Sequence, residues 1–190
     1  LSRYHKIGED DELDATRYLQ QRLLELNQKH PNKLVYNELI EWYYIQKQEF
    51  SYAFRFVKSI DLKTNSDGLK VLTFAQICKQ NNDFSTARKC YEYLLEFGES
   101  HPYYEQSKFE FLNATYLEIQ KAKVIDQNQV NMLIAEYEQQ YKASVRNPNT
   151  RYQLVMESSN LYAYYANQHE KAIALLEAEK DLPVYSLQQI

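Results

Sequence analysis

The chain has 190 residues, a formal net charge of −4, and only 3 glycines and 4 prolines. So few turn-forming residues disfavour a fold built on tight β-turns, and Lys and Arg are spread without the basic cluster that nucleic-acid binding requires. No run of about 18 apolar residues is present, so we expect no membrane insertion, and we recognise no signal peptide.

Helical patterns recur along the chain and predict a single array of helices. In the first of them Leu19, Leu23 and Leu26 fall on one face, at the spacing of an amphipathic helix. The expected order is a polar, loosely ordered leader at 1–12, a lone helix at 13–30, hairpins at 33–63 and 67–98, a longer third hairpin at 103–145, a fourth hairpin at 149–181, and the start of a further helix at 186–190.

An internal repeat is the most informative pattern in the sequence. Residues 46–55 read QKQEFSYAFR, and residues 80–89 read QNNDFSTARK. Gln, Phe, Ser and Ala recur in register, and the acidic and basic positions are matched by charge. The offset between the two segments, 80 minus 46, equals the period of the tetratricopeptide repeat (TPR). Residues 34–97 therefore resemble TPR helix hairpins.

The resemblance implies an all-α fold of antiparallel helix hairpins stacked into a right-handed superhelix, or α-solenoid, without a β-sheet. Phe50 and Phe84 would begin the second helices and wedge against the first helices. Ala53 and Ala87 would lie where the two helices of each hairpin cross closely. Tyr91, one turn after Ala87, would lie on the same buried face.

The sequence departs from the family pattern in three places. Glu41 stands where the family has a small residue, which Ala75 supplies in the second hairpin. His169 occupies the aromatic position of the fourth turn. The offset from Ala87 to Ala172 is two and a half times the family period, so we expect the third hairpin to exceed the family unit by about 17 residues.

The end of the chain is similar to long exported TPR proteins of bacteria. A segment reading EKAIALLE at 170–177 is followed by Leu182 and Pro183, as between repeats of those proteins. That resemblance implies a location in the bacterial cell envelope, in the periplasm, with the signal peptide outside this chain and further repeats after it. Those proteins are mostly of unassigned function.

No arrangement of residues typical of catalysis is apparent. Cys78 and Cys90 fit no zinc spacing and fall in predicted helices, so buried free thiols are favoured over a disulfide. The acidic run at 9–14 is typical of a solvated segment rather than a metal site. The histidines are dispersed: His5, His30, His101 and His169. We therefore expect no metal, no cofactor and no enzymatic activity.

The first helices of the hairpins carry the candidate site. In stacked hairpins these helices line the concave groove. Trp42 could anchor a ligand there, or it could pack as core against a neighbouring helix. By the family register the groove residues are Glu38, Trp42 and Gln46 from the first hairpin, and Leu72, Gln76 and Lys79 from the second.

Two functions follow from such a groove. The favoured one is a scaffold that binds a protein or peptide segment, because the groove mixes polar and apolar residues. The alternative is a carbohydrate- or nutrient-binding helper of the cell envelope. Glu38 and Trp42 occupy the two positions at which some TPR domains hold a peptide carboxylate, so anion capture of that kind is not expected.

Overall fold

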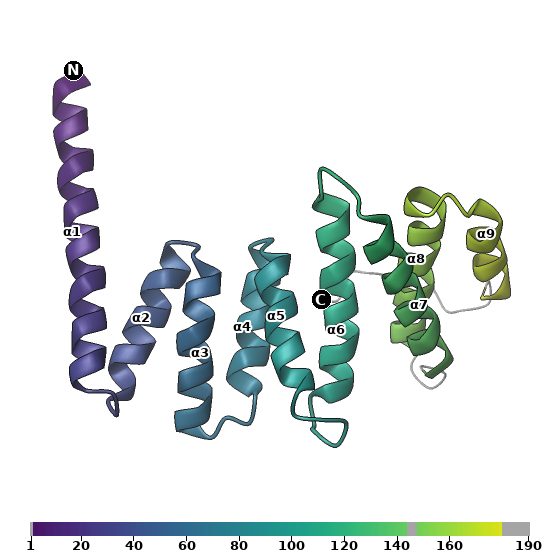
Figure 1. Ribbon diagram of the computed structural model, residues 1–190, viewed down its shortest axis with the longest axis horizontal. Helices are drawn as coiled ribbons and strands as arrows, with labels where there is room; N and C mark the ends of the chain where they lie inside the picture. Colours follow the sequence, from purple (N-terminus) through teal and green to yellow (C-terminus); the bar gives the residue numbers. More distant parts are fainter. Residues whose placement is uncertain (1, 144–147, 180–190) are drawn as a thin grey trace. The chain divides into compact units, whose positions relative to one another are not determined.

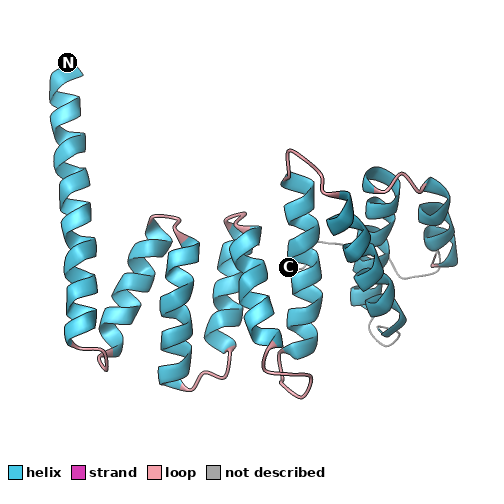
Figure 2. Ribbon diagram, in the orientation of Figure 1, coloured by secondary structure: helices cyan, strands magenta, loops and turns pink. Residues whose placement is uncertain are grey.

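The computed structural model describes residues 2–143 and 148–179, and these residues form helices without any strand (Figure 2). The prediction of an all-α fold is therefore confirmed. The helices are α1 (Ser2–Lys29), α2 (Leu34–Gln46), α3 (Phe50–Thr64), α4 (Leu69–Gln80), α5 (Phe84–Leu95), α6 (Tyr104–Lys121), α7 (Gln127–Ala143), α8 (Pro148–Asn160) and α9 (His169–Ala178), with a π-helical turn, η1 (Leu161–Tyr165), after α8 (Figure 1). The further helix expected at 186–190 lies outside the described residues.

The chain divides into two compact units, Leu1–Tyr104 (unit 1) and Glu105–Ile190 (unit 2). Unit 1 contains the hairpins α2–α3 and α4–α5, preceded by α1. Unit 2 contains α7 to α9 and nearly all of α6. The single continuous array predicted from the sequence stays a prediction.

The two hairpins of unit 1 repeat each other in detail. Each turn contains one residue in the left-handed conformation, Gln48 with φ 56° and Asn82 with φ 64°. The next amide in each turn donates to a carbonyl of the first helix at 2.9 Å, Glu49 to Tyr44 and Asp83 to Cys78. These contacts close a tight helix–turn–helix, and they recur at the offset of the sequence repeat.

The small residues predicted to lie at the helix crossings of the two hairpins are buried. Ala53 and Ala87 are fully buried, and Tyr91 is buried on the same face of α5. Phe50 and Phe84 are buried at the starts of the second helices. The side chain of Asp83 caps α5 by accepting a hydrogen bond from the amide of Thr86 at 3.0 Å.

Helix α1 differs from the expectation in two respects. It begins at Ser2, so residues 5–12 are helical and not loosely ordered. Polar composition does not prevent this, because Glu, Lys and Arg are good helix formers. Leu19, one period before Ala53, is 43% exposed, whereas Leu23 is buried. Among the described residues, no earlier helix pairs with α1 and covers Leu19.

The turn before α9 in unit 2 resembles the two turns of unit 1, but the hydrogen bond that closes it spans one more residue. Asn167 has φ 54°, and its offset from Asn82 is the same as that of Ala172 from Ala87. The amide of Gln168 donates to the carbonyl of Tyr162 at 2.8 Å, six residues back, where unit 1 spans five. The π-helical turn η1 accommodates the added residue.

Two further features of unit 2 concern the predicted fourth hairpin and the core. Ala172 is buried, but His169, in the aromatic position, is exposed and does not wedge between helices as Phe50 and Phe84 do. The polar imidazole remains in water.

The core of unit 2 consists of buried residues from α6 to α9: Leu112, Tyr116, Ile119, Val130, Leu133, Ile134, Tyr137, Leu154, Leu161, Tyr162 and Ala172.

Candidate functional site

Helix α2 carries an exposed apolar stripe, formed by Val35, Leu39 and Trp42 (the α2 stripe). Their side chains are 48%, 41% and 55% exposed, respectively. Their spacing of four and then three residues places them on one face of the helix. The exposure of Trp42 excludes the alternative in which it is part of the core. The indole is therefore available to a ligand.

The other predicted site residues do not share one environment. Glu38, Gln46 and Gln76 are exposed, and Lys79 is half-buried. Leu72 is only 6% exposed, so it belongs to the core and offers little surface to a ligand. Leu72 lies one repeat period after Glu38. The two residues occupy equivalent positions, and this position is exposed on α2 but covered on α4.

Several exposed residues of these faces were missed by the sequence analysis. On α2 they are Val35 and Leu39, and on α4 they are Leu69, which is 49% exposed, and Thr73. The repeat offset relates Val35 to Leu69 and Leu39 to Thr73. Extending the register toward the start of each first helix would have identified them.

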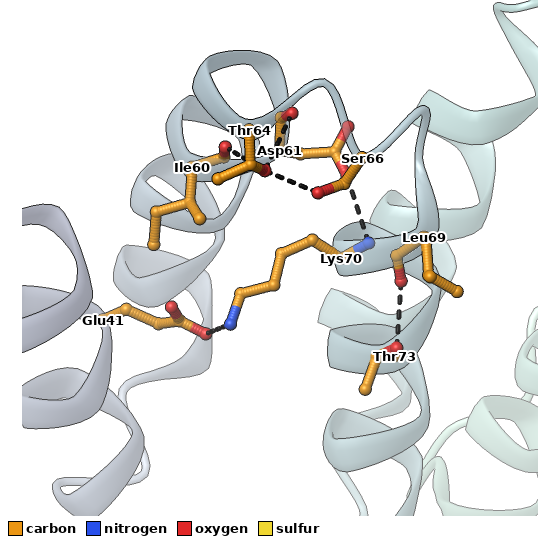
Figure 3. A network of polar contacts seen from close by, with 8 residues as sticks. All are labelled: Glu41, Ile60, Asp61, Thr64, Ser66, Leu69, Lys70 and Thr73. Carbon is orange, nitrogen blue, oxygen red and sulfur yellow. Dashed lines mark hydrogen bonds and ion pairs between the residues drawn. The ribbon is translucent and has the colours of Figure 1, made fainter. Parts of the chain in front are cut away.

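An ion pair with a buried carboxylate and a partly exposed ammonium group connects α2 to α4 beside the α2 stripe (Figure 3). The Nζ of Lys70, in the first turn of α4, lies 2.9 Å from Oε1 of Glu41 on α2. The Glu41 side chain is 8% exposed and that of Lys70 is 37% exposed. Glu41 therefore takes the place of the small residue by pairing with a cation of the next hairpin.

The carboxylate of Asp61 fixes the connection between the two hairpins. Asp61 is buried near the end of α3, and it accepts hydrogen bonds from the amides of Gly68 at 2.9 Å and Lys70 at 3.1 Å. These two donors are among the first amides of α4, which need partners outside the helix. Thr64 and Ser66 form a further side-chain hydrogen bond in the same loop (Figure 3). Together these contacts hold α4 in place relative to α2 and α3.

A second polar cluster lies in the core of unit 2, around Glu157 of α8. Its carboxylate accepts hydrogen bonds from Asn113 of α6 and Gln153 of α8, both at 2.7 Å, and from the hydroxyl of Tyr137 of α7. Burial, and then the charge of Glu157, raise the pKa of the Tyr137 phenol, which keeps it a donor. The cluster joins three helices. The only sequence signal for it is the position of Glu157 on the apolar face of Leu154 and Leu161.

The two cysteine thiols are enclosed in the core of unit 1. Cys78 and Cys90 are free and buried, as predicted. Burial, and then the hydrogen bond to Cys78, raise the pKa of the Cys90 thiol. Among the described residues, no group of three or more His, Cys, Asp or Glu side chains could hold a metal ion, and no helix has both the length and the hydropathy to cross a membrane.

No protein-family model matches the sequence, and no curated protein matches it. Two solved structures of a protein from Podosopora anserina, described as a kinesin light chain with nearly identical TPR-like repeats, are similar to this chain. One has a TM-score of 0.48 at 20% identity, and the other, a variant, has a TM-score of 0.47 at 18% identity. Each match covers 95% of this chain and 90% of that chain.

Identities of this size carry neither a partner nor an activity from one protein to another. The architecture follows from the chain itself. Its turns at Gln48 and Asn82, and the fully buried alanines Ala53 and Ala87, recur at the TPR period. The chain therefore has a TPR-like helix-hairpin fold.

Proposed function

We propose that this chain is a non-catalytic protein-interaction scaffold, which binds a segment of a partner protein on the exposed faces of α2 and α4. The exposure of Trp42 within the α2 stripe carries the proposal. Tryptophan is enriched among the residues that dominate binding energy at interfaces. An indole that is 55% exposed beside two exposed aliphatic side chains offers such an anchor.

The neighbouring face of α4 supports the same function. Leu69 gives it a second apolar contact, while Thr73, Gln76 and Gln80 are exposed and polar. The carboxamide groups of Gln76 and Gln80 can donate and accept hydrogen bonds to a peptide main chain. The hydroxyl of Thr73 donates to the carbonyl of Leu69, so it can only accept one. A face with apolar anchors and neutral polar groups suits a protein segment.

Capture with site-directed photo-crosslinking tests the proposal. A crosslinking residue at Gln46, beside the α2 stripe, should capture a partner from the native source, and the additional change Trp42→Ala should abolish the capture. Leu62 provides the matched control, because it is 65% exposed on α3. Leu62→Ala should leave the capture at Gln46 unchanged. Capture that persists in a folded Trp42→Ala protein would exclude the α2 stripe as the binding site.

The carbohydrate alternative is a distinct outcome of a second measurement. Trp42 is the only tryptophan of the chain, so its fluorescence reports on this face alone. Saturable quenching of that fluorescence by a soluble oligosaccharide would replace the protein-binding proposal with the carbohydrate one.

A further inference from the structure

We infer that Glu38 and Trp42 together recognise an arginine side chain of the partner segment. This inference rests on the proposed function, because it names the chemistry that the same face selects. The two residues lie four positions apart on α2, so their Cβ atoms are neighbours at about 5–6 Å on one face of the helix. Both side chains are exposed.

Neither side chain is engaged by another residue of the described part of the chain. Among the residues that the structure describes, Glu38 makes no hydrogen bond or ion pair, and Trp42 makes no ring contact. Other groups nearby differ in this respect. Glu41 pairs with Lys70, and the ring of Tyr44 stacks on those of Tyr52 and Phe56 at centroid distances of 5.5 and 5.9 Å.

The charge of this face is complementary to a cation. Helix α2 contains no Lys or Arg, and its two acids are Glu38 and Glu41. Because Lys70 compensates Glu41, Glu38 is the acid of α2 that has no ion pair with another described residue. A partner with a basic side chain would supply the missing counter-charge, whereas an acidic partner would be repelled.

Arginine satisfies both groups at once. Its planar guanidinium can stack on the face of an indole while its N–H groups donate in a fork to a carboxylate. Lysine has a compact, strongly hydrated ammonium group, so it cannot match both the planar surface and the carboxylate in this way. The exposed side chains of Leu39 and Val35 can contact apolar neighbours of the arginine.

The face of α4 lacks this pair and so sets the register of the segment. The equivalents of Glu38 and Trp42, one repeat period later, are Leu72 and Gln76. Leu72 is buried and Gln76 is neutral, so they offer a guanidinium neither a carboxylate nor a ring. We therefore expect one arginine over α2 and uncharged residues over α4.

The test is a random peptide library displayed on phage, selected on the folded protein and counter-selected on Trp42→Ala. Binders specific for Trp42 should carry one preferred position occupied by Arg in preference to Lys. In the best binder, replacing that Arg with the neutral isostere citrulline should weaken binding roughly tenfold, as exposed cation–π and ion-pair contacts suggest. The fluorescence of Trp42 gives the binding curve.

Two protein variants complete the experiment. Glu38→Gln should weaken the arginine peptide by a smaller factor, because it removes the ion pair and keeps the stacking on Trp42. It should leave the citrulline peptide unaffected, and the control Glu92→Gln, at an exposed position on α5, should change neither. Peptides that require Trp42 but show no preference for Arg would overturn the inference and leave the proposed function intact. Peptides that bind Trp42→Ala equally well, or a library without any binder to this face, would count against both.

Discussion

Gly68 gives the sharpest test of how the two hairpins of unit 1 are joined. It precedes α4 with φ +87°, a left-handed conformation that side chains rarely adopt, and its amide donates to Asp61. A Cβ at this position would lie 2.7 Å from Cδ2 of Leu94, which is fully buried. Gly68→Ala should therefore combine backbone strain with overpacking of the core.

Gly98 separates these two effects, because it shares one of them only. It also has φ +87°, but a Cβ there would meet nothing within 4 Å. Gly98→Ala should destabilise the protein by about 1–2 kcal/mol, which is the cost of a left-handed conformation for a residue with a side chain. Gly68→Ala adds an overpacking cost of about 1–3 kcal/mol. Any effect of alanine on the unfolded chain is common to both variants and cancels in their difference.

The measurement is urea unfolding followed by far-ultraviolet circular dichroism, with both variants compared to the parent. We expect Gly68→Ala to lower the free energy of unfolding further than Gly98→Ala, by the overpacking cost. Against a Leu94→Ala background, which removes the opposing methyl group, the additional cost of Gly68→Ala should shrink. Equal destabilisation by the two glycine variants would refute the contact with Leu94.

Three further predictions concern the buried face of α5, the ion pair between Glu41 and Lys70, and the phenol of Tyr137. Ala87→Leu should destabilise the protein by about 1–3 kcal/mol through overpacking, and Tyr91→Ala by about 2–5 kcal/mol through the cavity it leaves. If both variants unfold in urea like the parent, the assigned repeat register is wrong. Lys70→Met should lower the free energy of unfolding by about 1–3 kcal/mol because it leaves the buried Glu41 carboxylate unpaired, and adding Glu41→Met should recover much of that loss. A Lys70→Met variant as stable as the parent would contradict this. Burial raises the pKa of Tyr137 above the usual 10.0, so the folded state keeps this phenol protonated. The resulting contribution to stability is full below pH 10.0 and is lost as the pH rises above that value. In an alkaline titration followed by ultraviolet absorbance, ionisation of Tyr137 should therefore coincide with unfolding rather than precede it.

The sequence by itself determined the helices, the period and the residues at the helix crossings. These features are local, or they repeat at a fixed offset. Phe50 and Ala53 have their counterparts in Phe84 and Ala87, and all four are buried. A helical period identifies an apolar face, and a small residue within it marks where another helix approaches closely. The helical state of residues 5–12 was missed because a polar segment shows no such face.

Only the tertiary structure decided which polar and aromatic residues are buried. Glu41 violates the family pattern, yet it is buried because Lys70, from the next hairpin, supplies its counter-charge. Trp42, one position on, is exposed, while Leu72 is covered at the register position where Glu38 meets solvent. The pattern of a single helix gives the direction of each side chain. Whether that direction leads into core or solvent depends on neighbouring helices, whose residues are distant in the sequence and meet only when the hairpins pack.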